Sequence, residues 1–248
     1  MSALSIDIRE KVFANGLRAL DNLGFTTEQH QFTAIVGPSG AGKSTLLNIV
    51  AGLDTDVAGS VTTSDKRPHI GFMFQQARLL PWLSVRQNIE LVIEGLPPAE
   101  HEAARARCEL LLEQVGLGDF TETFPGQLSI GMQRRVSLVR AFVIQPGLLL
   151  MDEPFQSLDE PTAEQLRELL LDLWRETRAS VLFVTHNLRE ALALADRVLF
   201  LSARPATVIL DYQVKAERPR PADGPAVCRL HDELLRRHPE ILSGAINR

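Results

Sequence analysis

A glycine-rich segment, GPSGAGKST, matches the phosphate-binding pattern G-x-x-x-x-G-K-[ST]. Its glycines let the backbone turn tightly and aim N–H groups inward, and the helix predicted to follow adds the positive end of its dipole. Lys43 would then meet the outer phosphates of a nucleotide, and the Ser44 hydroxyl would ligate Mg²⁺. A glycine-rich turn without a ligand is the alternative. The predicted phosphate-binding residues are Gly37, Pro38, Ser39, Gly40, Ala41, Gly42, Lys43, Ser44 and Thr45.

Two adjacent carboxylates end another apolar segment, LLLMDEP. Asp152 suits the coordination sphere of Mg²⁺, through a water, and Glu153 suits the polarisation of an attacking water. An acidic pair after a strand is more often a turn or a helix cap, but a phosphate loop on the same kind of sheet favours the catalytic role. Because the guanine-specific pattern N-K-x-D does not occur in the sequence, the expected ligand is ATP with Mg²⁺.

Short apolar segments, several of them β-branched or aromatic-rich, predict the buried strands that position these residues. They alternate with helical patterns, which is typical of an α/β core with a parallel sheet. Between about 82 and 145 the pattern changes to successive helices without a convincing strand, which indicates an inserted helical subdomain. The five expected strands are Phe32 to Val36, His69 to Phe74, Gly147 to Met151, Ser180 to Thr185 and Arg197 to Leu201.

The composition is that of a globular protein with a full core, since 45% of its 248 residues are hydrophobic. A net charge of -5 and a pI near 5.7 argue against a general affinity for nucleic acid. No apolar run approaches the roughly 18 residues that a membrane-spanning helix needs, so we expect a cytoplasmic location. Cys108 and Cys228 are far apart and lack companions at metal-ligand spacing, which predicts ordinary reduced thiols.

The motifs occur in a characteristic order along the chain. After the phosphate loop come Gln75 following HIGFMF, the segment LSIGMQ, LLLMDEP with SLD close behind, and His186 following SVLFVT. In this order and spacing the chain resembles the nucleotide-binding subunit of ABC transporters over nearly its whole length. The resemblance implies that residues 1–248 form a single nucleotide-binding domain with a P-loop NTPase (RecA-like) core of the α/β class and an N-terminal antiparallel β region. The implied parts are an α/β core at about 1–76 and 146–203, a helical subdomain at about 77–145 and a short C-terminal extension at 204–248.

Several site residues are assigned by this resemblance. Gln75 matches the glutamine that contacts Mg²⁺ and water and links the nucleotide to the transmembrane partner, with a polar strand cap as the alternative. His186 matches the histidine that hydrogen-bonds the γ-phosphate, although a lone histidine after a strand is usually structural. Phe13, in KVFANG, matches the aromatic residue that stacks on adenine, and a core position is the alternative.

In the family, the signature sequence LSGGQ caps ATP that is bound to the phosphate loop of a second subunit, in a head-to-tail dimer. Ser129 and Gly131 are the matching positions, and a hydroxyl, a glycine N–H and a helix start do form an incomplete anion site. Asp159, in SLD, resembles the loop that crosses the dimer interface and is also a candidate helix N-cap before Pro161.

Three positions depart from the family pattern. Ile130 replaces the first signature glycine, and a β-branched residue resists positive φ and adds bulk near the phosphate. If the signature needs that backbone geometry, the composite site is weakened. Met132 is a milder change, because LSGGMQ-R is a variant found in subunits of bacterial importers. Gln156 stands where the family more often has a small residue.

The segments FQQARLLPWLSVRQNI and GMQRRVSLVRA resemble importer subunits for nitrate, sulfonates, taurine or thiamine precursors. The implied partners are a transmembrane permease, a second cassette expected to be a copy of this chain, and indirectly a periplasmic or extracellular solute-binding protein. Nucleic acid is not among them. The implied location is peripheral, on the cytoplasmic face of the inner membrane. Leu79, Leu80 and Trp82 would be exposed apolar anchors for the permease, and a packed hinge of the subdomain is the alternative.

Two alternatives to the importer assignment stay open from the sequence. One is an ABC-type ATPase that acts apart from a membrane, on nucleic acid or ribosomes. The other is a regulatory cassette whose altered signature, LSIGM, has weakened turnover. Against the second stand the intact Lys43, Asp152, Glu153 and His186.

Overall fold

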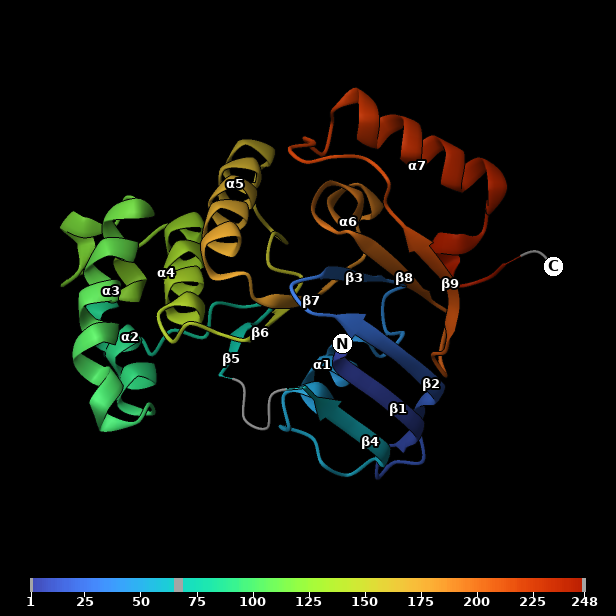
Figure 1. Cartoon of the computed structure of the whole chain (residues 1–248), viewed down its shortest axis with the longest axis horizontal. Coiled ribbons are helices and arrows are strands. Elements are labelled where there is room, and N and C mark those ends of the chain that lie inside the picture. The colour runs from blue at the N-terminus through green and yellow to red at the C-terminus, as the bar shows by residue number, and fades with distance from the viewer. Residues whose placement is uncertain (1, 65–68, 247–248) are drawn as a thin grey trace. The chain divides into compact units, whose positions relative to one another are not determined.

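The computed structural model describes residues 2–64 and 69–246 (Figure 1). The chain divides into two compact units. The first unit comprises Met1–Pro68, Leu150–Glu153 and Ser180–Arg248, and the second comprises His69–Leu149 and Pro154–Ala179.

An antiparallel sheet of three strands begins the first unit. It consists of β1 (Ser2–Val12), β2 (Arg18–Glu28) and β4 (Ala58–Thr63), in the order β2-β1-β4. Along β2 buried and exposed residues largely alternate, as expected when one face of an antiparallel sheet packs against a core and the other meets water. This sheet confirms the predicted N-terminal β region.

The main sheet has six strands, in the order β5-β6-β7-β3-β8-β9. In the first unit, β3 (Phe32–Val36) pairs in parallel with β7 (Ser180–Thr185) and β8 (Arg197–Leu201), and β9 (Val208–Gln213) runs antiparallel to β8. Every residue of β3 and β7 is buried, because parallel strands are covered on both faces. The other two strands are β5 (Ile70–Met73) and β6 (Leu148–Asp152). All five strands predicted from apolar segments are confirmed.

The described residues of the first unit form three α-helices: α1 (Lys43–Val50), α6 (Leu188–Leu194) and α7 (Pro225–Arg237). The segment RPRP before α7 satisfies carbonyl groups at the end of α6. Arg220, which is buried, donates to the carbonyls of Leu192 and Ala195, and Arg218 donates to the carbonyl of Leu194. Cations at a helix C-terminus are favoured by the helix dipole, so this proline-rich segment acts as a cap. A short 3₁₀ turn, η4 (Ile241–Ser243), follows α7.

The second unit is mostly helical. Its α-helices are α2 (Val85–Glu94), α3 (His101–Gln114), α4 (Ile130–Phe142) and α5 (Glu160–Thr177), and its 3₁₀ turns are η1 (Pro98–Glu100), η2 (Gly118–Phe120) and η3 (Pro125–Gln127). Helix α4 packs against α2, α3, α5 and β5. Residues 82–145 contain helices and turns but no strand, as the sequence predicts.

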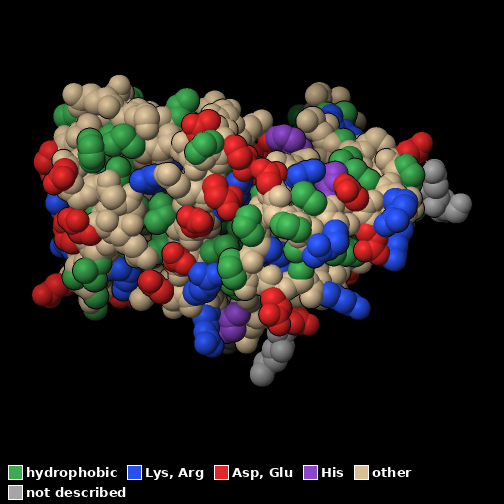
Figure 2. Space-filling model, turned by 90° about the horizontal axis from the view of Figure 1, so that it is seen from above, with side chains coloured by type: hydrophobic (Ala, Val, Ile, Leu, Met, Phe, Trp, Pro, Cys, Tyr) green, Lys and Arg blue, Asp and Glu red, His purple; other side chains and the backbone are tan. Residues whose placement is uncertain are grey.

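Surface properties agree with the composition. On the face seen in Figure 2, basic and acidic side chains are interspersed, and no basic stripe of the kind that binds nucleic acid stands out among the described residues. Within residues 2–64 and 69–246, no helix combines the length and the apolar character that crossing a membrane requires.

Candidate functional site

The phosphate loop lies in the first unit, between the buried strand β3 and helix α1. Gly42 is the N-cap of α1 and has φ 105°, a conformation that L side chains rarely adopt. A Cβ at this position would lie 2.9 Å from Leu20 Cδ2, so neither the backbone nor the packing accepts another residue. The loop therefore has the backbone that its sequence predicts.

Lys43, the first residue of α1, is 5% exposed. Its ammonium group donates to the carbonyl oxygens of Gly37 (2.9 Å) and Pro38 (3.0 Å) and lies 3.8 Å from Glu153 Oε1. Burial lowers the pKa of Lys43, while the charges of Glu153 and Asp152 counteract that shift. The lysine is thus held over the loop as a cation among oxygen atoms, where a phosphate group would be attracted.

Ser44 and Asp152 meet beside the loop, with Ser44 Oγ donating to Asp152 Oδ1 at 3.1 Å. Both are hard oxygen donors, and Mg²⁺ is usually bound by one or two such groups together with phosphate oxygens and waters. Among the described residues, no group of three or more His, Cys, Asp or Glu side chains forms an all-protein metal site. These residues fit a magnesium nucleotide better than a resident metal.

Glu153 follows β6 and pairs with His186. Glu153 Oε2 lies 2.9 Å from His186 Nδ1, a distance at which a ring N–H can donate to the carboxylate. Glu153 has a φ of 44°, a left-handed conformation that costs on the order of 1 kcal/mol in a residue other than glycine. Its N–H is anchored on the carbonyl of Val184 at 3.0 Å. Backbone strain of this kind concentrates at functional sites.

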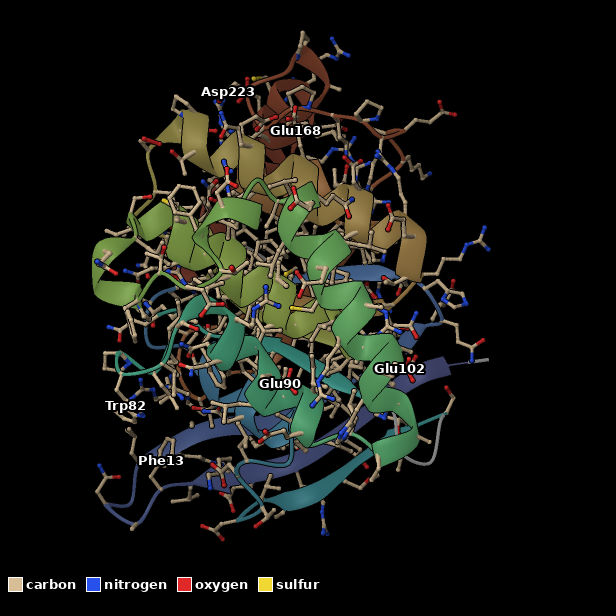
Figure 3. The ribbon with its side chains drawn as sticks, turned by 90° about the vertical axis from the view of Figure 1, so that its left-hand side faces the viewer. Phe13, Trp82, Glu90, Glu102, Glu168 and Asp223 are labelled. Carbon is tan, nitrogen blue, oxygen red and sulfur yellow. The ribbon has the colours of Figure 1, made fainter. Side chains whose placement is uncertain are left out.

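Phe13 lies in the hairpin loop between β1 and β2, where its N–H donates to the carbonyl of Leu17 (Figure 3). The side chain is 37% exposed, so the core alternative is wrong. The Lys11 ammonium lies 5.3 Å from the ring centroid and is itself fixed by Asp54. An exposed aromatic ring supported by a cation is a suitable surface for stacking a base.

In the second unit, Ser129 is the N-cap of α4, and its Oγ accepts from the N–H of Met132 at 3.2 Å. Ile130 begins the helix with helical backbone and is 57% exposed. The positive φ that would have conflicted with a β-branched residue is therefore not required here. Gly131 follows within the helix, so its N–H belongs to the first turn, where N–H groups have no acceptor within the helix.

Asp159 is the N-cap of α5, since its carboxylate accepts from the N–H of Thr162 at 3.0 Å and from the Thr162 hydroxyl at 3.1 Å. Those two hydrogen bonds lower the pKa of Asp159. Pro161 lies in the first turn of the helix, where a missing N–H does no harm. The capping role predicted for Asp159 is confirmed, and the role at a dimer interface stays a prediction.

Gln75 follows β5 and is exposed. Its side-chain amide donates to Gln156 Oε1 at 2.5 Å, and its main-chain carbonyl accepts from Arg134. The sequence singled out Gln156 only for its size and gave Arg134 no role. Both contacts join residues far apart in the chain, so no local pattern could have revealed them.

The apolar stretch that follows Gln75 is less exposed than predicted. Ala77 and Val85 are buried, and Leu79 and Leu80 are half-buried. Of the large apolar side chains in this stretch, that of Trp82 is the exposed one, with 68% of its surface accessible, in the loop before α2 (Figure 3). Leu79 and Leu80 are therefore less accessible than predicted, and the role of all three side chains as anchors for a permease stays a prediction.

Comparison with known proteins identifies the family. The family model for ABC transporters matches residues 20–156. The aliphatic sulfonates import ATP-binding protein SsuB of Bacillus licheniformis is 37% identical, over 94% of this chain and 93% of its own length. The nitrate import ATP-binding protein NrtD of Synechocystis is 41% identical, over 77% of this chain and 73% of its own length. The chain belongs to the ABC transporter ATP-binding family.

The solved structure of a dimeric ATP-binding cassette in a post-hydrolysis state, bound to ADP and Pi, agrees with this assignment. It has a TM-score of 0.73 and 30% identity, and the match covers 86% of this chain and all of that one. The present chain is accordingly an ABC-type ATPase with a P-loop α/β core. Neither the matched family nor these relatives favour a regulatory cassette without turnover.

In this ABC ATPase the first unit brings together Lys43, Ser44, Asp152, Glu153 and His186. The group combines a cation for phosphate, two oxygen donors for Mg²⁺, and a carboxylate next to an imidazole. Such a set can bind a triphosphate and hold an attacking water through the carboxylate of Glu153.

One further contact of the phosphate loop was not predicted. Arg204, in the turn after β8, donates from Nε to the carbonyl of Gly40 at 2.9 Å. The N–H of its neighbour Ala203 donates to the carbonyl of Gly244, so the C-terminal segment supports the same turn. An arginine distant in sequence leaves no local signal, which explains why it was missed.

Proposed function

We propose that this ATPase energises the import of a small solute, of the nitrate, sulfonate, taurine or thiamine-precursor type, through a separate permease. The similarity to a sulfonate import subunit, which extends over 94% of the chain, is the observation that carries the proposal. The nitrate import relative supports the same group of solutes. Solute selection is assigned to the permease and a solute-binding protein, because the contacts proposed for the cassette are with the nucleotide, a second cassette and the permease.

The proposed site assigns each residue one task. Lys43 and the loop N–H groups hold the β- and γ-phosphates, while Ser44, Asp152 and Gln75 hold Mg²⁺, which would neutralise phosphate charge. Glu153 orients the attacking water, and His186 meets the γ-phosphate through Nε2. Phe13 stacks on adenine.

The proposed assembly contains two cassettes, each completing the other's site. Ser129 and Gly131 at the start of α4 would receive the γ-phosphate held by the partner, as a helix N-terminus favours an anion. Closure then depends on contacts made only when ATP is bound, which is how a ligand shifts a conformational equilibrium. Trp82 would dock the permease, because exposed tryptophans are frequent anchors of interfaces. The complex would lie at the cytoplasmic face of the membrane.

The direct test has two parts. Glu153→Gln should abolish steady-state hydrolysis while preserving ATP binding, and sedimentation should show dimers only with ATP. Deleting the chain from the organism that carries it should then prevent growth on an alkanesulfonate as sole sulfur source or on nitrate as sole nitrogen source. Unimpaired growth on both would exclude nitrate and sulfonates as the solute, and turnover by the glutamine variant would refute the role of Glu153.

A further inference from the structure

One buried side chain of helix α4, that of Arg134, forms hydrogen bonds with the segment that contains Gln75. Arg134 is 5% exposed, and its Nη1 donates to the carbonyl of Phe74 at 2.9 Å. Its Nη2 donates to the carbonyl of Gln75 and lies 3.5 Å from the carbonyl of Gln156. A single guanidinium therefore contacts the main chain on both sides of the side-chain hydrogen bond between Gln75 and Gln156.

The physical setting makes these contacts strong. The segment after β5 is neither strand nor helix up to 84, so its carbonyls need partners from elsewhere. Charge-assisted hydrogen bonds are roughly twice as strong as neutral ones, and a planar guanidinium can serve several acceptors at once. Burial lowers the pKa of Arg134, but an arginine stays charged in a protein. The main chain at Gln75 is thus fixed to the helix that carries the signature sequence.

The side chain of Gln75, by contrast, has room to move. Gln75, Arg134 and Gln156 line a cavity of about 520 Å³, together with Ile130 and Gln133 at the start of α4. Gln75 is exposed, so its amide can leave Gln156 without crossing packed core. The backbone is held, while the amide has open space beside it.

We propose that Arg134 is a positioning residue for hydrolysis, which fixes the main chain of Gln75 to α4 so that only the amide exchanges between Gln156 and the nucleotide. The start of the same helix carries Ser129, so a displacement of α4 is transmitted to Gln75 through Arg134. The inference rests on the proposed role of Gln75 at Mg²⁺ and water. It gives the signature helix an influence on the chemistry within its own chain, in addition to its contact with a partner's phosphate.

The test is a double-mutant cycle in ATPase activity between Arg134→Lys and Gln75→Ala. Lysine keeps the charge but replaces the planar guanidinium, whose two nitrogens reach the carbonyls of Phe74 and Gln75, by a single nitrogen on a shorter side chain. A misplacement of about 1 Å can reduce the rate by up to roughly 10²-fold. We expect kcat to fall at least about tenfold with ATP affinity unchanged, and no further loss when Gln75 is already alanine.

Arg140 supplies the matched control. It lies on the same helix and donates to the carbonyls of Ala77 and Arg78, just beyond Gln75. Arg140→Lys removes a similar grip on the same segment, so its effect should be small and equal in the presence and absence of the Gln75 amide. Equal losses from Arg134→Lys and Arg140→Lys would show general loosening of the segment and overturn the proposal.

The remaining outcomes distinguish a failure of the inference about Arg134 from a failure of the role assigned to Gln75. If Arg134→Lys lowers kcat equally with and without the Gln75 amide, Arg134 does not act through Gln75, and the importer assignment is unaffected. If Gln75→Ala leaves kcat unchanged, the assigned role of Gln75 and this inference both fail. Thermal unfolding checks each variant. Should Arg134→Lys not fold, Arg134→Gln, which keeps an amide donor, must show the same non-additivity.

Discussion

Gly131 is the signature residue at which packing most directly requires a glycine. It lies in the first turn of α4 with helical backbone, and a Cβ built on it would lie 2.7 Å from Thr162 Cγ2. Carbon atoms pack comfortably at about 3.5–4.0 Å, so Gly131→Ala must displace one of the two groups by about 1 Å. Thr162 is not free to rotate away, because both its N–H and its hydroxyl are bonded to Asp159.

The expected change in stability is a balance of two effects. Overpacking costs about 1–3 kcal/mol, whereas replacing a helical glycine by alanine gains about 1 kcal/mol. Gly131→Ala should therefore lower the free energy of unfolding by about 0–2 kcal/mol. Thr162→Ser removes the clashing methyl and keeps the hydroxyl that binds Asp159. With serine at 162, Gly131→Ala should raise the free energy of unfolding instead.

Urea unfolding of the four chains in this cycle measures the coupling between positions 131 and 162. A coupling free energy below about 0.5 kcal/mol, the range of independent sites, would refute the packing argument. ATPase activity of the double variant adds a second result. Restored stability with restored turnover would make Gly131 a packing requirement alone. Restored stability without turnover would show that the partner's phosphate also needs a small residue.

Three further predictions concern single side chains. Burial raises the pKa of Cys108 to about 11, so an alkylating reagent should modify half-buried Cys228 and spare Cys108 until the chain unfolds. Mass spectrometry of the labelled protein measures this, and rapid labelling of both cysteines in the folded chain would contradict it. Burial lowers the pKa of Lys43 below 10.5, and a bound phosphate favours the charged form of the lysine, so ATP affinity should fall as pH rises through the lowered pKa. Calorimetry in buffers of different ionisation enthalpy should then detect proton uptake on ATP binding. The absence of proton uptake at every alkaline pH would refute the predicted direction of the pKa shift. Arg204→Ala removes the guanidinium from the carbonyl of Gly40 and should weaken ATP binding several-fold. Because Arg204 is exposed, the free energy of unfolding should change by less than about 0.5 kcal/mol. A fluorescent-nucleotide titration, with Arg204→Lys as a partial rescue, tests this, and unchanged affinity would exclude a role of Arg204 in the phosphate loop.

Features governed by neighbours in sequence could be predicted well. The strands β3 and β7 are wholly buried and largely apolar because a parallel sheet is covered on both faces, and this leaves a nearly continuous apolar pattern in the sequence. The phosphate loop is contiguous, and the N-cap Asp159 obeys a rule that spans only three residues. Each of these depends on short-range physics, so the sequence alone contained the necessary information.

Features that depend on tertiary packing could not be predicted. The hydrogen bond from Gln75 to Gln156 joins residues 81 positions apart, and Arg134 reaches Phe74 across 60 positions. The half-burial of Leu79 and Leu80 likewise depends on how the second unit folds around them. The left-handed backbone of Glu153 has no sequence signal either, because strain is tolerated only where the surrounding structure holds it.

Ile130 shows how the structure changes the meaning of a departure from the family pattern. From the sequence, its β-branched side chain is expected to resist a positive φ and to add bulk near a phosphate. In the structure Ser129 takes the extended N-cap conformation, with φ -63° and ψ 161°, and Ile130 begins a regular helix. Only the bulk of the side chain remains as a difference, and it is 57% exposed. The substitution therefore leaves the fold of the single chain intact, and its consequences are confined to whatever meets the start of α4 when two cassettes close on ATP.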